Sequence, residues 1–152
     1  MNYWLVKSPF RTRSWQDVLV KGVFKLYGIR NHQSKNNISK MKAGDKAFFY
    51  HGPSGKQIYG IMQVNKSAYA DPTTNALNWL AIDFEPVRTF DVPVRLEQIR
   101  SIPDLQNITL LKQPRVSVAP ITRDEFDKIV NMSKDKLYGL TPEETAIVEG
   151  KG

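Results

Sequence analysis

The chain contains no cysteine, only two histidines and no long apolar run. Without cysteine it can form neither a disulfide framework nor a thiolate zinc site. Two isolated histidines, His32 and His51, are too few for a metal site, so we expect no metal and no cofactor. No apolar stretch approaches the roughly 20 residues of a membrane helix, and the first residues lack the features of a signal peptide. We expect a soluble, cytoplasmic protein without a membrane partner, and a monomer by default.

Acidic residues are scarce in the first third of the chain. Residues 1–56 contain eleven lysines and arginines but only Asp17 and Asp45, whereas residues 57–152 contain eleven basic and thirteen acidic residues. The net charge of +7 therefore originates in the first third. This asymmetry suits a surface that faces a polyanion, because phosphate contacts release counterions and supply affinity independent of sequence. The alternative is a solvated basic face that aids solubility.

Motifs typical of enzymes are missing as well. There is no G-x-S-x-G motif, and neither histidine lies in a recognisable nucleophile motif. The segment Gly52-Pro53-Ser54-Gly55-Lys56 lacks the spacing of a phosphate-binding loop, and we interpret it as a turn. We expect a protein without catalytic activity.

The residues that are present predict a mixed α/β domain with a buried core. A length of 152 residues, of which 41% are hydrophobic, is typical of one domain. Side-chain patterning and turn residues predict strands over residues 3–7, 46–50, 57–64, 79–87 and 115–119. Helical spacing and caps predict helices over residues 14–20, 31–41 and 94–102, after the Thr122–Glu125 capping box, and from Thr141. We expect a curved sheet or partial barrel with helices at its margins, and Trp4 and Trp15 in its core.

The segment from Tyr27 to Asn31 carries chemistry suited to a nucleobase. An aromatic ring, a flexible glycine, a guanidinium and an amide lie within five residues, just before a predicted helix. The arginine can bond a phosphate or stack on a ring, and the asparagine offers the donor and acceptor that a base edge requires. Stacking of an aromatic side chain on a base contributes ~1–3 kcal/mol. The alternative is a loop in which Arg30 and Asn31 only cap the helix.

A second aromatic segment, Phe48-Phe49-Tyr50-His51, ends a predicted strand. Strand alternation places Phe48 and Tyr50 on one face and Phe49 and His51 on the other. We expect one pair to face the core and the other to face the site. Trp79, at the start of another strand, is either a stacking wall or a partly buried core residue.

These motifs together resemble the EVE domain family. The resemblance rests on Tyr3-Trp4-Leu5, Lys7-Ser8, Gly28-Ile29-Arg30-Asn31, Ala47-Phe48-Phe49-Tyr50-His51, Asp71-Pro72-Thr73, Trp79 and Arg115. It implies one domain over residues 1–132, followed by a C-terminal extension over residues 133–152 with a short helix. The family commonly has a tryptophan where this chain has Tyr27.

The resemblance implies a PUA-like pseudo-β-barrel of five to six strands that reads modified bases in DNA or RNA, related to YTH domains. A flipped, methylated or otherwise modified base would be held in a pocket beside a basic surface. The expected base pocket comprises Ser8, Tyr27, Gly28, Ile29, Asn31, Tyr50, His51 and Trp79. The expected backbone contacts are Lys7, Arg30, Lys35 and Arg115.

Two other functions stay open. Some PUA-like relatives are hydrolases, and Lys7, Ser8 and His51 could converge on a modified nucleotide with Asp83 as the carboxylate. A basic face could also bind an acidic protein partner.

Overall fold

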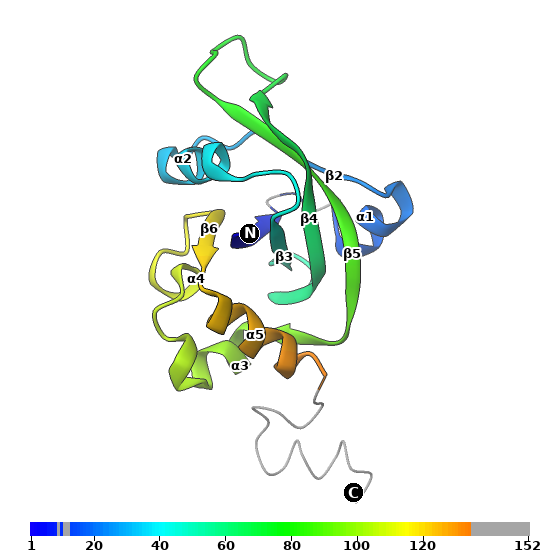
Figure 1. Cartoon of the computed structure of the whole chain (residues 1–152), viewed down its shortest axis with the longest axis vertical. Coiled ribbons are helices and arrows are strands. Elements are labelled where there is room, and N and C mark those ends of the chain that lie inside the picture. Colours follow the sequence, from blue (N-terminus) through cyan, green and yellow to red (C-terminus); the bar gives the residue numbers. More distant parts are fainter. Residues whose placement is uncertain (9, 11–12, 135–152) are drawn as a thin grey trace, which may run out of the picture.

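The computed structural model describes residues 1–8, 10 and 13–134. Its strands form one curved sheet in the order β2-β5-β4-β3-β1-β6 (Figure 1). The strands are β1 (Tyr3–Ser8), β2 (Phe24–Leu26), β3 (Lys46–His51), β4 (Gln57–Ala70), β5 (Leu80–Arg95) and β6 (Val118–Ile121). The helices are α1 (Trp15–Lys21), α2 (His32–Lys40), α3 (Leu96–Ser101), η1 (Pro103–Leu105), α4 (Thr109–Lys112) and α5 (Arg123–Met132). The predicted mixed α/β class is confirmed.

Strand pairing places the ends of β1 and β3 side by side. These two strands run parallel, and all other neighbouring strands are antiparallel. The long β4–β5 hairpin shifts register at several points, and such irregularities bend a strand pair. The hairpin therefore curves across the molecule, and its tip projects beyond the body next to α2 (Figure 1).

Both faces of the central strands are buried, which corrects the expectation that one face of β3 is free for a site. Phe49 lies in a core cluster with Trp4 and Trp15, which are buried as predicted. On the opposite face, Phe48 and Tyr50 pack in a second cluster with residues of α3 and α5. Alternation was predicted correctly, but helices and loops distant in sequence cover each side.

Local signals located most helix boundaries. The side chains of Ser14, Asn31 and Thr122 each accept a hydrogen bond from the first turn of the following helix, so α1, α2 and α5 begin close to their predicted starts. Gly22 ends α1 at φ +71°, a left-handed conformation that favours glycine. No helix among the described residues is long and apolar enough to cross a membrane.

The strand boundaries needed correction. β4 continues to Ala70 where we expected a loop, because its exposed residues around Lys66 pair with β5. β5 in turn continues to Arg95, so α3 begins two residues later than predicted. β6 lies over 118–121 instead of 115–119, and the short β2 was not predicted. The helix expected from Thr141 lies outside the described residues.

Candidate functional site

Ser8 and His51 are register partners at the adjoining ends of β1 and β3. Both are buried, and both bond the backbone of the segment that follows β1. Ser8 Oγ donates to the carbonyl of Arg13 (3.0 Å), and His51 Nε2 donates to the carbonyl of Phe10 (2.7 Å). Because a carbonyl only accepts, Nε2 carries a hydrogen, and Nδ1 lies within hydrogen-bond distance of the Ser54 hydroxyl. These two side chains hold the backbone at Phe10 and Arg13 next to the ends of β1 and β3.

Phe10 and Arg13 of that segment pack against Tyr27, which follows β2, and the two aromatic rings are tilted by 46°. The rings of Phe10 and Tyr27 have centroids 5.3 Å apart, and the Arg13 guanidinium carbon lies 4.3 Å from each centroid. Arg13 also donates to the carbonyl of Lys25 (2.8 Å). Burial lowers the pKa of the Arg13 guanidinium, which stays protonated. We call Phe10, Arg13 and Tyr27 the aromatic–arginine stack.

Only Tyr27 of this stack was predicted. Phe10 and Arg13 lie two and five residues after Ser8, so their position close to a predicted strand end was the available signal. Arg13 also lines a cavity of about 150 Å³ between α1 and β2. The cavity has apolar walls from Val18 and Phe24, among others.

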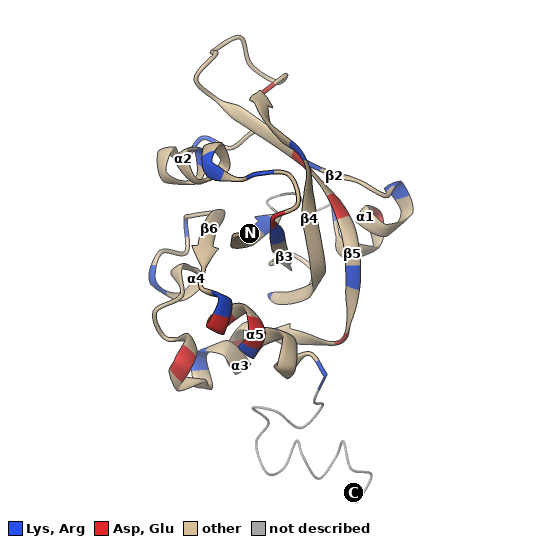
Figure 2. Cartoon of the chain, in the orientation of Figure 1, with Lys and Arg blue, Asp and Glu red and all other residues tan. Residues whose placement is uncertain are grey.

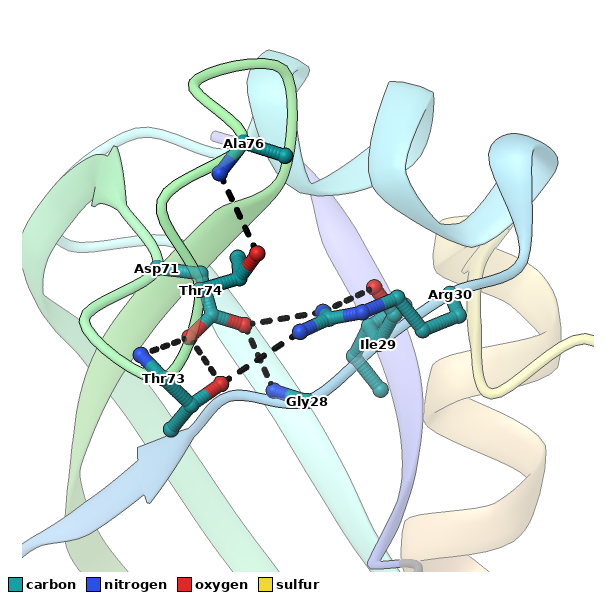
Figure 3. A network of polar contacts seen from close by, with 7 residues as sticks. All are labelled: Gly28, Ile29, Arg30, Asp71, Thr73, Thr74 and Ala76. Carbon is teal, nitrogen blue, oxygen red and sulfur yellow. Dashed lines mark hydrogen bonds and ion pairs between the residues drawn. The ribbon is translucent and has the colours of Figure 1, made fainter.

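Gly28 and Arg30 are bound to the β4–β5 hairpin through the buried carboxylate of Asp71 (Figure 3). One carboxylate oxygen accepts from the Gly28 amide (2.7 Å) and from Arg30 Nη1 (3.1 Å), and the other accepts from the amide and hydroxyl of Thr73. Burial alone raises the pKa of Asp71, but the hydrogen bonds from Thr73, Gly28 and Arg30 outweigh it and lower the pKa to about 2. The ionised carboxylate of Asp71 therefore links the β4–β5 hairpin to the segment that contains Gly28 and Arg30.

A second aromatic surface lies beside this network. The Trp79 ring, half-buried, has the Arg30 guanidinium carbon 5.4 Å from its centroid and the His32 ring centroid at 4.9 Å. The Arg30 side chain is 43% exposed despite its ion pair with Asp71. Arg30 thus combines an anchored guanidinium with an open edge that an anion can reach.

Asn31 is the N-cap of α2, as the alternative interpretation of this segment proposed. Its Oδ1 accepts from the Ser34 amide (2.8 Å). Among the described residues, no partner bonds its Nδ2 group. One side chain therefore stabilises the helix start and retains an amide donor.

The expected backbone-binding residues gather where α2, β1 and the loop before β6 meet. Ser117 donates to Ser34 Oγ (2.9 Å) and accepts from the Lys7 amide (2.8 Å). Lys35 on α2 is half-buried, and Arg115 in the loop is exposed. Figure 2 shows lysines and arginines along α2 and this loop. The Lys7 ammonium instead donates to the Pro114 carbonyl (2.6 Å), and burial lowers its pKa.

The structure does not bring all the predicted pocket residues into one pocket. Ser8 and His51 lie by the aromatic–arginine stack, whereas Tyr50, their neighbour along β3, points into the opposite core cluster. Burial raises the pKa of Tyr50, and the Lys7 ammonium nitrogen lies 5.8 Å from the centroid of its ring. Ile29 is buried in the first core cluster.

The contacts also bear on the hydrolase hypothesis. Ser8 and His51 each bond a backbone carbonyl, and Asp83 accepts from the Tyr69 hydroxyl. Burial and this bond raise the pKa of Tyr69 to about 12. Within the part of the chain described, no serine–histidine–carboxylate array forms.

Relatives were found by both sequence and structure. Residues 2–132 match the EVE domain family. Thymocyte nuclear protein 1 of Mus musculus is 28% identical over 172 residues, which cover 88% of this chain and 74% of that protein. A protein from Agrobacterium tumefaciens superposes with a TM-score of 0.85 at 34% identity, covering 93% of this chain and 99% of the other.

Two solved structures of similar proteins contain a nucleic acid. The human THYN1 protein in complex with 5-methylcytosine-containing DNA has a TM-score of 0.80 at 26% identity, and the match covers 89% of this chain and 99% of the other. The YTH domain of Zygosaccharomyces rouxii MRB1, in complex with N6-methyladenosine RNA, has a TM-score of 0.56 at 14% identity. The second likeness concerns the fold alone, and it agrees with the expected PUA-like architecture. By its match over residues 2–132 and by its relatives, the chain belongs to the EVE domain family.

Proposed function

We propose that this chain binds DNA that carries a modified base such as 5-methylcytosine, and that it holds this base out of the helix beside Tyr27. The aromatic–arginine stack is the observation that carries the proposal, because it offers flat surfaces next to a basic region. The complex of the human THYN1 relative with 5-methylcytosine-containing DNA supports the choice of ligand.

The chemistry of the stack fits an extruded base. The Tyr27 ring provides a stacking surface, which contributes ~1–3 kcal/mol per base. The Arg13 guanidinium stacks on a second face or bonds the base edge. The apolar walls of the adjoining cavity, Val18 and Phe24 among them, accommodate an added methyl group.

The sugar–phosphate backbone would follow the start of α2. The first turn of this helix offers backbone amides and a partial positive charge. The exposed edge of Arg30 and the side chains of Lys35 and Arg115 lie around it. These groups supply affinity that does not depend on the base.

Replacing Tyr27 tests the proposal. Kd is measured by fluorescence anisotropy, at one salt concentration, for an oligonucleotide with a single 5-methylcytosine and for its unmethylated counterpart. Tyr27→Ala should weaken binding to the methylated probe about tenfold, which corresponds to ~1.4 kcal/mol of lost stacking. Its effect on the Kd of the unmethylated probe should be smaller. The matched control Tyr27→Phe keeps the ring and should stay within about twofold of the wild type.

Equal binding of both probes by the wild-type protein would refute modified-base recognition. Equal losses on both probes in Tyr27→Ala would place the base elsewhere. The same probe pair made of RNA decides between the two polymers, since the 2′-hydroxyl distinguishes them.

A further inference from the structure

The tip of the β4–β5 hairpin, residues 72–79, has a composition unlike the rest of the chain. No charged residue occurs from Pro72 to Ile82, although 24% of the chain is charged. Two threonines and two asparagines flank Leu77 in the sequence, and this large apolar side chain is 84% exposed. A single exposed leucine is common on protein surfaces. What distinguishes this one is the way in which the tip is held.

The tip is anchored at its base and braced internally (Figure 3). At its base, the Asp71 amide donates to the Trp79 carbonyl (3.0 Å), and the Asp71 carboxylate binds Gly28 and Arg30. Within the tip, the Ala76 amide donates to Thr74 Oγ1 (3.1 Å). Leu77 follows Ala76 directly, so this hydrogen-bonded loop presents it to solvent.

This anchoring places the base of the tip, at Asp71, beside the proposed base site. Gly28, which the hairpin binds through Asp71, is the neighbour of Tyr27 in the chain. Uncharged amides and hydroxyls bond base edges, whereas phosphates attract the cations that the tip lacks. Its chemistry therefore suits the interior of a duplex, and the basic residues of α2 and the loop before β6 suit its exterior.

Resting on the proposed function, we infer that the hairpin tip enters the DNA duplex at the modified base and that Leu77 fills the space which the extruded base leaves. Proteins that distort DNA insert leucine and similar apolar side chains between base steps. Extrusion from a duplex costs a few kcal/mol, and it costs least when the base is already unpaired. A wedge of this kind therefore matters for a paired base and is dispensable for an unpaired one.

The test compares Leu77→Ala with the wild type on three probes that contain one 5-methylcytosine. The probes are a fully paired duplex, the same duplex with an abasic site opposite the modified base, and the single strand. Leu77→Ala should weaken binding to the paired duplex about tenfold and leave the other two probes within about twofold. Val20→Ala is the matched control, since Val20 is 76% exposed on α1, and it should change none of the three.

A second readout follows the base stack directly. With 2-aminopurine next to the 5-methylcytosine in the paired duplex, the wild type should increase its fluorescence on binding, and Leu77→Ala should lose most of that increase. The proposed insertion of Leu77 would be overturned if Leu77→Ala lost affinity equally for all three probes, or if its affinity for the paired duplex were unchanged. Failure of the wild type to prefer the methylated single strand over an unmethylated one would instead overturn the proposed function, whatever Leu77 does.

Discussion

Asn31 shows how one side chain can serve both the fold and the site. Its carboxamide oxygen caps α2, while its amide nitrogen has no partner among the described residues. From the sequence, capping and base recognition were competing explanations of this residue. The structure shows the first and leaves a donor for the second, so substitutions must separate the two roles.

Serine and alanine at position 31 make this separation. Asn31→Ser keeps a cap acceptor but removes the amide donor, whereas Asn31→Ala removes both. We expect Asn31→Ala to lower the free energy of unfolding by about 1 kcal/mol, and Asn31→Ser by much less. Both should lose preference for the methylated probe, as measured by anisotropy alongside urea denaturation. If Asn31→Ser keeps the full preference, the residue is only a cap.

The β4–β5 hairpin is the element that connects the two halves of the site. Asp71, at the end of β4, binds Gly28 and Arg30, which lie 43 and 41 residues earlier in the chain. Its pKa of about 2 is below the ordinary value of about 3.9 expected in the unfolded chain. The ionised carboxylate thus stabilises the folded state at pH above about 4. This contribution, on the order of 2 kcal/mol, is lost as the pH falls through about 2.

Asp71→Asn should remove this pH dependence. The carboxylate accepts hydrogen bonds from neighbouring N–H groups, whereas the asparagine NH₂ group would place a second donor against them. The free energy of unfolding should therefore fall at neutral pH by about 1–3 kcal/mol. Urea denaturation between pH 5 and 2 should show a smaller decline in the variant than in the wild type. Asp91→Asn, at an exposed position on β5, serves as the control and should behave like the wild type. An unchanged decline in Asp71→Asn would assign the acid sensitivity to other carboxylates.

At the scale of the whole molecule, the two signs of charge are partly separated. Lysines and arginines lie along α2 and the loop before β6, while α5 carries Asp124, Glu125 and Asp127 (Figure 2). Phosphate contacts of the basic region release counterions, so the affinity for DNA should fall steeply with salt. This electrostatic contribution is independent of the base that occupies the site.

Lys35→Ala and Arg115→Ala test the electrostatic contribution. Each should reduce the slope of log Kd against log salt concentration by about 1. Each should also weaken binding to the methylated and the unmethylated probe by the same factor. Arg123→Ala on α5, where Asp127 lies 3.8 Å away, is the matched control and should leave the slope unchanged. Loss confined to the methylated probe would instead place Lys35 or Arg115 at the base.

Local patterns were sufficient for part of this description. Capping residues located α1, α2 and α5, and alternation assigned Phe48 and Phe49 to opposite faces of β3. The charge imbalance and the family motifs both indicated a nucleic-acid partner. These features depend on residues that are close in the chain, which is why the sequence by itself determined them.

Other features were decided only by contacts between distant segments. β2 has three residues and exists because Phe24–Leu26 pairs with β5, and β4 extends through its polar residues for the same reason. His51 bonds the Phe10 carbonyl after β1, and Asp71 bonds the Gly28 amide, although no short-range rule connects either pair. The sequence determined which side chains carry the chemistry. The tertiary structure decided which of them meet, because hydrogen-bond partners more than 40 residues apart become neighbours only when the sheet closes around its two core clusters.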